Sequence, residues 1–109
     1  MADQAFPDAL PAQYRLEQNF PNPFNPSTTI RFALPKASSV SLRIYNIIGQ
    51  LVATVSNTTL DAGTYSMKWN GTDDAGKQLG SGIYFAKLTA SSTDGKSNFV
   101  QTRKLLLMK

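Results

Sequence analysis

Short runs of alternating apolar and polar residues, separated by turn-forming residues, recur along most of this chain. Tyr65, Met67 and Trp69 alternate with polar residues, which is the period-two pattern of a half-buried strand. Four glycines and Asp73-Asp74 then follow within residues 71–82, and these residue types suit turns. The alternation resumes in residues 84–90. The stretch 69–88 therefore predicts two strands joined by a polar loop, next to the only tryptophan of the chain.

The same patterning predicts about seven strands, and no 10-residue window has a helical period. The expected strands are residues 28–34, 40–45, 50–56, 58–60, 63–70, 82–90 and 98–108. The side chains expected to share a strand face are Ile30 with Phe32 and Leu34, Val40 with Leu42 and Ile44, Leu51 with Ala53 and Val55, and Tyr84 with Ala86 and Leu88. Seven short antiparallel strands in about 90 residues favour an all-β, immunoglobulin-like β-sandwich of two sheets.

Composition removes several classes of function. The 109 residues contain neither cysteine nor histidine, and the hydroxyl groups and Lys77 have no partner base. We therefore expect no enzymatic activity, no cofactor and no metal site. The net charge of +4 is spread without a basic run, which argues against nucleic-acid binding. No apolar segment approaches the roughly 20 residues of a membrane span, and the first residues do not resemble a signal peptide.

Asp73 and Asp74 are the only adjacent carboxylates. In a turn they can accept hydrogen bonds from backbone N–H groups, and this is the role that we expect. The alternatives are a calcium site shared with Asn70 and a catalytic pair, but the spacing of a calcium loop is absent.

Two segments precede the first expected strand. Residues 1–18 read as a flexible linker, and its apolar residues are expected in a solvated tail rather than docked on the domain: Phe6, Leu10, Tyr14 and Leu16. Residues 19–28, which we call the lead-in, contain three prolines and should be rigid. Phe20 and Phe24 would anchor it. It is either a kinked approach to the first strand or a polyproline-like docking surface.

Two strands carry more apolar residues than alternation requires. Ile83 and Phe85 lie on the face opposite Tyr84, so either a loop covers them or they form a small patch for a partner. The apolar residues 105–108 lie between Lys104 and Lys109. This pattern fits a strand buried on both faces, a strand whose outer face meets another protein, or an edge that accepts one.

These motifs together resemble the C-terminal sorting domain of proteins exported by the type IX secretion system of Bacteroidetes. The resemblance covers residues 19–109. It rests on NFPNPFNPSTTIRFALP, VSLRIYNIIGQLV, LDAGTYSMKWNGTDDAGKQLGSGIYFAKL and the terminal KLLLMK. It implies an immunoglobulin-like fold and a non-catalytic address tag on a larger cargo protein.

The resemblance also implies partners and sites. The partners would be the outer-membrane translocon, a surface sortase and a cargo domain fused ahead of residue 1, with cleavage in or near residues 1–18 and a destination at the cell surface. The recognition residues that it implies are Gly82, Ile83, Tyr84, Phe85, Lys104, Leu105, Leu106, Leu107, Met108 and Lys109. The lead-in motif that it implies is Asn22, Pro23, Phe24, Asn25 and Pro26.

Two alternatives remain open. The segment WNGTDDAGKQLGSGIY is also similar to the immunoglobulin-like domain of flagellar hook-capping proteins, which would make the chain a structural or assembly module. The third possibility is an accessory carbohydrate-binding module, for which Tyr14, Tyr45, Tyr65 and Tyr84 would supply aromatic surface.

Overall fold

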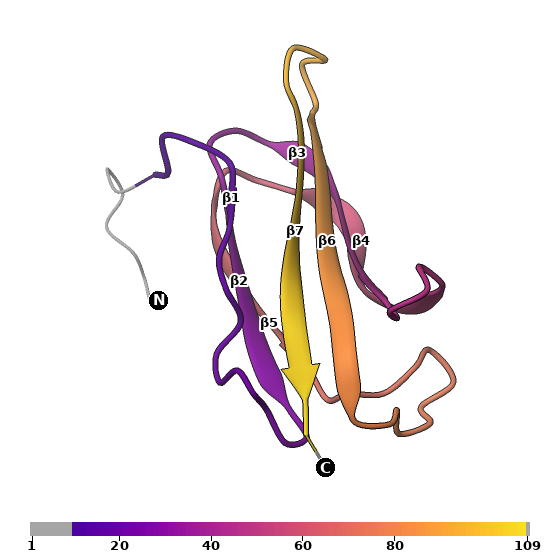
Figure 1. Cartoon of the computed structure of the whole chain (residues 1–109). Helices are drawn as coiled ribbons and strands as arrows, with labels where there is room; N and C mark the ends of the chain where they lie inside the picture. Colours follow the sequence, from indigo (N-terminus) through magenta and orange to yellow (C-terminus); the bar gives the residue numbers. More distant parts are fainter. Residues whose placement is uncertain (1–9, 109) are drawn as a thin grey trace.

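The computed structural model describes residues 10–108 and folds them into two packed antiparallel sheets (Figure 1). The strands are β1 (Arg15–Leu16), β2 (Thr28–Leu34), β3 (Ser38–Tyr45), β4 (Leu51–Leu60), β5 (Gly63–Trp69), β6 (Gly82–Ser92) and β7 (Asn98–Leu107). One sheet has the order β1-β2-β5 and the other has the order β4-β3-β6-β7. The predicted immunoglobulin-like sandwich of seven strands is confirmed. Within residues 10–108 there is no helix that could span a membrane.

The core lies between the two sheets and consists of the side chains that alternation placed inward. Phe32, Leu42, Ile44 and Leu88 have no exposed surface at all. Burying a side chain of this size contributes about 1.5–3 kcal/mol. A chain without disulfides can therefore fold on this interior alone.

The assignment of β4 corrects one prediction. The expected strands 50–56 and 58–60 form one continuous strand, and two irregularities occur in its pairing with β3. A β-bulge shifts the alternation of side chains by one residue. Leu51 therefore lies opposite Tyr45 and is 48% exposed, whereas Ala53 is buried as expected.

The predicted linker is also partly wrong. Arg15 and Leu16 form β1, and the side chain of Leu16 is fully buried. Tyr14 stacks on Phe99 of β7 with ring centroids 5.4 Å apart. A strand of two residues is too short to show an alternating pattern. Burial of the Leu16 side chain holds it in place. Leu10 is 58% exposed, as expected of a tail, and Phe6 lies outside the described residues.

Two side chains of β7 form hydrogen bonds with the backbone along the free edge of β1. The Leu16 backbone N–H donates to Gln101 Oε1 at 3.0 Å, and Arg103 Nε donates to the Leu16 carbonyl at 2.9 Å. The two sheets are thus joined along this side by polar side chains rather than by a shared strand.

Candidate recognition surface

The pairing of β6 with β7 brings the Gly-x-Tyr motif directly against the terminal motif. Gly82 lies opposite Leu107, Ile83 opposite Leu106, and Tyr84 opposite Leu105. Figure 1 shows the two strands side by side along the edge of the larger sheet. Residues more than 20 positions apart therefore form one surface. Lys109 lies outside the described residues.

The lead-in packs on the other side of this end of β7. The Phe24 N–H donates to the Leu106 carbonyl at 3.0 Å, and the Met108 N–H donates to the Phe24 carbonyl at 2.9 Å. Asn22 Oδ1 accepts the Leu106 N–H at 2.9 Å. The edge of β7 is thus occupied between Leu106 and Met108. A partner strand could pair there only after displacing the lead-in.

Only one of the two expected anchors of the lead-in is buried. Phe24 is 2% exposed, but Phe20 is 81% exposed, so its expected anchoring role is wrong. Phe24 pairs with Leu107, whereas the backbone of Phe20 bridges Thr29 and leaves the ring in solvent. Asn22, Pro23, Asn25 and Pro26 are exposed around the buried Phe24.

An aromatic cluster links the lead-in to the Gly-x-Tyr motif through the core. The Trp69 ring lies 5.6 Å from the ring of Phe24 and 5.9 Å from that of Tyr84. The Tyr84 hydroxyl donates to the Gly80 carbonyl at 2.8 Å, and burial raises the pKa of the Tyr84 phenol. Tyr84 is therefore a core residue whose polar end is satisfied by the backbone.

Gly71, two residues after the tryptophan, permits the lead-in to approach. Its φ is +71°, and a Cβ on it would lie 3.0 Å from the Pro26 carbonyl oxygen and 3.4 Å from the Leu107 side chain. A side chain at this position would push apart the lead-in and the terminal strand. The Trp-x-Gly motif is thus explained by packing.

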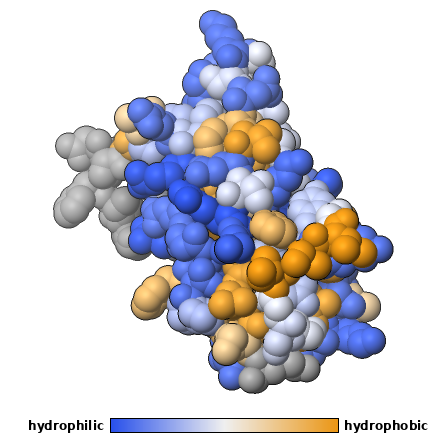
Figure 2. All heavy atoms as spheres, viewed as in Figure 1, coloured by the Kyte–Doolittle hydropathy of each residue, from blue (hydrophilic) through white to orange (hydrophobic). Residues whose placement is uncertain are grey.

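The outer face of the larger sheet, opposite the core, carries an apolar band. We use this name for Ile47 and Ile48 of the β3–β4 turn, Ile83 and Phe85 of β6, Leu106 of β7 and Met108 beyond it. Ile47 and Ile48 are 67% and 74% exposed, and Met108 is 50% exposed. Ile83, Phe85 and Leu106 are half-buried. Figure 2 shows this orange band crossing from the end of β7 to the β3–β4 turn. Of the alternatives for Ile83 and Phe85, a patch on the surface fits better than complete cover by a loop.

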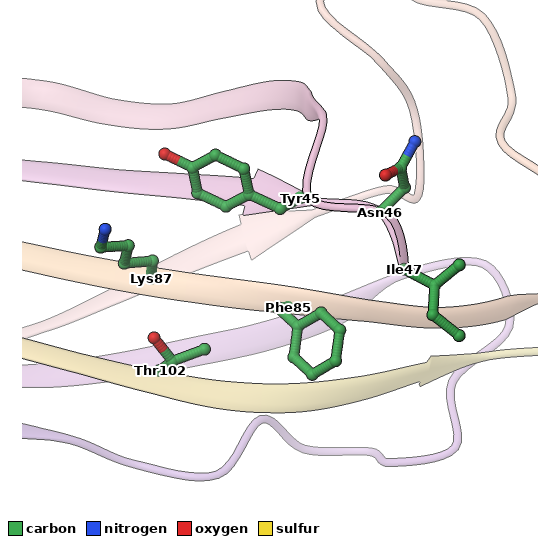
Figure 3. A pocket seen from close by; sticks show the side chains of 7 residues that line it. Tyr45, Asn46, Ile47, Phe85, Lys87 and Thr102 are labelled. Carbon is green, nitrogen blue, oxygen red and sulfur yellow. The ribbon is translucent and has the colours of Figure 1, made fainter.

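A groove of about 330 Å³ lies beside the apolar band. Its lining comes from β3, β6, β7 and the β3–β4 turn: Tyr45, Asn46, Ile47, Gly49, Phe85, Lys87 and Thr102. Figure 3 shows the Phe85 ring and the side chains of Lys87 and Thr102 along two strands, with Ile47 projecting at one end. The groove thus combines aromatic walls with a cation.

The sequence prediction missed the β3–β4 turn. The sequence pattern places residues 46–49 only as a connection between two expected strands, although two adjacent isoleucines in a turn have no core to enter. Their exposure was the available signal, because large apolar side chains gathered at a surface mark contact sites.

The acidic pair makes turn interactions, as predicted. Asp73 Oδ1 accepts the N–H groups of Ala75 and Lys77, at 3.0 and 2.9 Å. Asp74 Oδ1 accepts the Thr54 N–H at 2.8 Å, which ties this loop to β4. Among residues 10–108, no group of three or more His, Cys, Asp or Glu side chains could hold a metal ion.

The four tyrosines do not form a row. Tyr84 is buried, Tyr14 stacks on Phe99, Tyr65 stacks on Phe32, and Tyr45 lines the groove. They therefore offer no shared platform for a polysaccharide chain.

Residues 24–94 match the family model of the FlgD Ig-like domain. This chain belongs to the FlgD Ig-like domain family. A search of curated proteins found no match to the chain. The match begins at Phe24 and ends at Asp94, so neither the start of the lead-in nor β7 falls within it.

Solved structures show the same fold. Dimeric latent PorU from Porphyromonas gingivalis is similar with a TM-score of 0.71 and 21% identity, over 93% of this chain and 10% of PorU. PorZ from the same bacterium, described as a surface component of the type IX secretion system, is similar with a TM-score of 0.51 and 21% identity, over 86% of this chain and 11% of PorZ. FlgD from P. aeruginosa is similar with a TM-score of 0.59 and 28% identity, over 73% of this chain and 60% of FlgD. The chain thus spans about a tenth of the length of PorU and PorZ.

Proposed function

We propose that this FlgD Ig-like domain is a non-catalytic C-terminal sorting domain, which directs a larger cargo protein through the type IX translocon to the cell surface. The observation that carries the proposal is the meeting of three motifs that resemble those of sorting domains. The lead-in motif and the Gly-x-Tyr motif both contact the terminal motif at one end of β7, and Trp69 bridges Phe24 and Tyr84. The family match covers only part of this arrangement.

The recognised surface in this proposal is the apolar band together with Lys104. Ile83 and Leu106 lie opposite each other in the β6–β7 register, and Lys104 lies opposite Phe85. Tyr84, Leu105 and Leu107 are buried, so their part in recognition is to hold these neighbours in place. The similarity to PorZ, at 21% identity, supports the fold, and the sorting function rests on the motifs.

The direct test is a gain of export. A fluorescent reporter with a signal peptide is fused ahead of residue 1 and expressed in a bacterium that has a type IX system and in a strain that lacks its translocon. We expect the reporter to become accessible to protease on intact cells of the first strain only. A reporter that stays in the periplasm of both strains, or reaches the surface of both, would contradict the proposal. Mass spectrometry of the exported reporter then shows whether a sortase cleaves within residues 1–18.

The second candidate is a structural or assembly module, as in hook-capping proteins. The family match and the 28% identity to FlgD favour it. It predicts that the purified domain self-associates or binds flagellar hook filaments. A domain that is monomeric in analytical ultracentrifugation and does not sediment with hooks would eliminate this candidate.

A further inference from the structure

Two cations oppose each other on the outer face of the larger sheet. Arg43 on β3 and Lys87 on β6 are direct partners in the strand register. Their neighbours Leu42, Ile44, Ala86 and Leu88 are buried, so both charged side chains are on the outer face. Like charges directly opposite each other destabilise a sheet. An arrangement of this kind is relieved when an anion binds between them.

No carboxylate of the described chain neutralises this pair. The ion pairs between residues 10 and 108 are Arg15–Glu17 and Lys36–Asp94, both away from this face. Within the same range, Arg43 Nε is buried without a hydrogen-bond partner. Asp74 accepts the N–H of Thr54, which lies opposite Arg43 in the β3–β4 register, but its carboxylate forms no ion pair with Arg43. The guanidinium group of Arg43 is therefore held against the sheet without a counterion from this part of the molecule.

A third cation and the groove continue the same surface. Lys104 lies opposite Phe85, one diagonal step from Lys87, and diagonal neighbours in a sheet are roughly 7–8 Å apart. The groove, lined by Tyr45, Phe85 and Lys87, begins at this cationic row and leads into the apolar band. The three cations and the aromatic walls form one continuous surface.

The chemistry of this surface selects one kind of partner. The outer-face positions of β3, β6 and β7 include no acidic residue, so the complementary charge is negative. The apolar band beside that charge is mostly aliphatic. A nucleic acid supplies aromatic bases with polar edges and an acidic polysaccharide supplies hydroxylated rings, whereas a protein segment supplies aliphatic side chains next to a carboxylate. A volume of about 330 Å³ is at the lower end of the range of ligand pockets and suits one or two side chains.

We infer that the outer face of β3, β6 and β7 binds an acidic segment of a partner protein. A carboxylate of the segment lies between Arg43 and Lys87, and an adjacent apolar side chain occupies the groove. This inference does not rest on the sorting function, because it follows from the charges and the groove alone. It holds equally for a partner that takes part in assembly.

The test is a titration of the isotopically labelled domain, followed by NMR at low ionic strength. The probe is the blocked hexapeptide Gly-Glu-Leu-Glu-Phe-Gly, and the matched probe has glutamine in place of both glutamates. We expect the acidic peptide to shift the amide signals of β3, β6 and the β3–β4 turn, and to bind at least about tenfold more tightly than the glutamine peptide. Equal binding of the two peptides, or shifts confined to the other sheet, would overturn the inference.

Charge variants locate the site. The double variant Arg43→Gln/Lys87→Gln should weaken binding of the acidic peptide about tenfold or more, whereas Lys68→Gln/Lys77→Gln, which removes two exposed cations elsewhere, should change it less than about twofold. If both double variants lose the same amount of affinity for the acidic peptide, binding depends only on net charge and the inference is overturned.

A fold control and a competitor complete the test. Lys87→Gln alone should raise the melting temperature by roughly 1–6 °C, because it removes the opposed like charge, so that its weaker binding cannot be ascribed to unfolding. An oligomer of galacturonic acid that binds this face more tightly than the peptide would also contradict a protein partner.

Discussion

On β6 and β7, successive side chains alternate between two environments. Tyr84 and Leu105 point into the sandwich and are 8% and 0% exposed, whereas their neighbours Ile83 and Leu106 lie half-buried on the outer face. Tyr84 contacts Trp69 of the aromatic cluster, whereas the outer residues are partly exposed to solvent. The same motifs therefore combine residues that fold the domain with residues available to a partner, so substitutions should separate the two roles.

The largest loss of stability is expected from a substitution on the inner face. Tyr84→Ala should lower the free energy of unfolding by about 3–5 kcal/mol, the scale of other aromatic-to-alanine losses in cores. Tyr84→Phe keeps the ring and loses only the hydrogen bond to the Gly80 carbonyl, at a cost of about 0.5–1.5 kcal/mol. Urea unfolding of both variants measures the difference. A Tyr84→Ala domain as stable as the wild type would place the ring outside the core.

The next effect tests how firmly the lead-in is packed on β7. Gly71→Ala should cost about 1–3 kcal/mol, because it combines a positive φ with a Cβ 3.0 Å from the Pro26 carbonyl oxygen. Gly76→Ala is the matched control, since its φ is +86° and no atom lies within 4 Å of its Cβ. If the melting temperatures of both variants fall by the same amount, the contact with the lead-in contributes nothing measurable to stability.

A smaller effect is expected at the edge of β7. Asn22→Ala removes the acceptor of the Leu106 N–H and should cost about 0.5–1.5 kcal/mol. Hydrogen exchange at the Leu106 amide should become faster, while the amide of Leu88 in the centre of the sheet exchanges as before. Unchanged exchange at Leu106 would mean that the lead-in does not protect this edge.

The smallest effect is expected at the far end of the β6–β7 hairpin. A hydrogen bond from Ser92, the backbone N–H of Lys96 and a hydrogen bond from Lys36 lower the pKa of Asp94 from 3.8 to about 2. Because the folded pKa is below the unfolded one, this carboxylate stabilises the domain above pH 3.8, and the contribution is lost as the pH falls towards 2. Asp94→Asn should therefore be less stable than the wild type at neutral pH and approach it at low pH. A constant difference across an acid titration would contradict this linkage.

Alternation predicted most of the fold because β2, β3 and most of β6 bury one face, and β5 and β7 keep the same alternation with one face partly buried. It failed where the local pattern and the tertiary structure diverge. The bulges of β4 moved Leu51 outward, and β1 is too short to show a period. Both phenylalanines of the lead-in are flanked by one asparagine and one proline, in opposite order, yet only Phe24 reaches Trp69. Which of them is buried depends on contacts with β7, which are remote in sequence.

Part of the candidate site was predictable from residues that depart from strict alternation. Apolar residues on both faces of a strand indicated a contact surface at Ile83, Phe85 and the terminal strand. The β6–β7 register brings these residues together. The contribution of Ile47 and Ile48, and the opposition of Arg43 and Lys87, depend on strand order and register. Neither follows from the spacing of residues along the chain.

We propose that the outer face of β6 and β7 is recognised while the inner face folds the domain. It is tested most directly by surface export of the reporter fusion carrying Ile83→Ser/Leu106→Ser. Val100→Ser is the control, because Val100 lies on the same face of β7, is 59% exposed and is outside the apolar band.

We predict that the double variant folds, with a melting curve close to that of the wild type, and leaves the reporter in the periplasm, whereas the Val100→Ser fusion reaches the surface. A folded Ile83→Ser/Leu106→Ser fusion that is exported as well as the wild type would contradict the account.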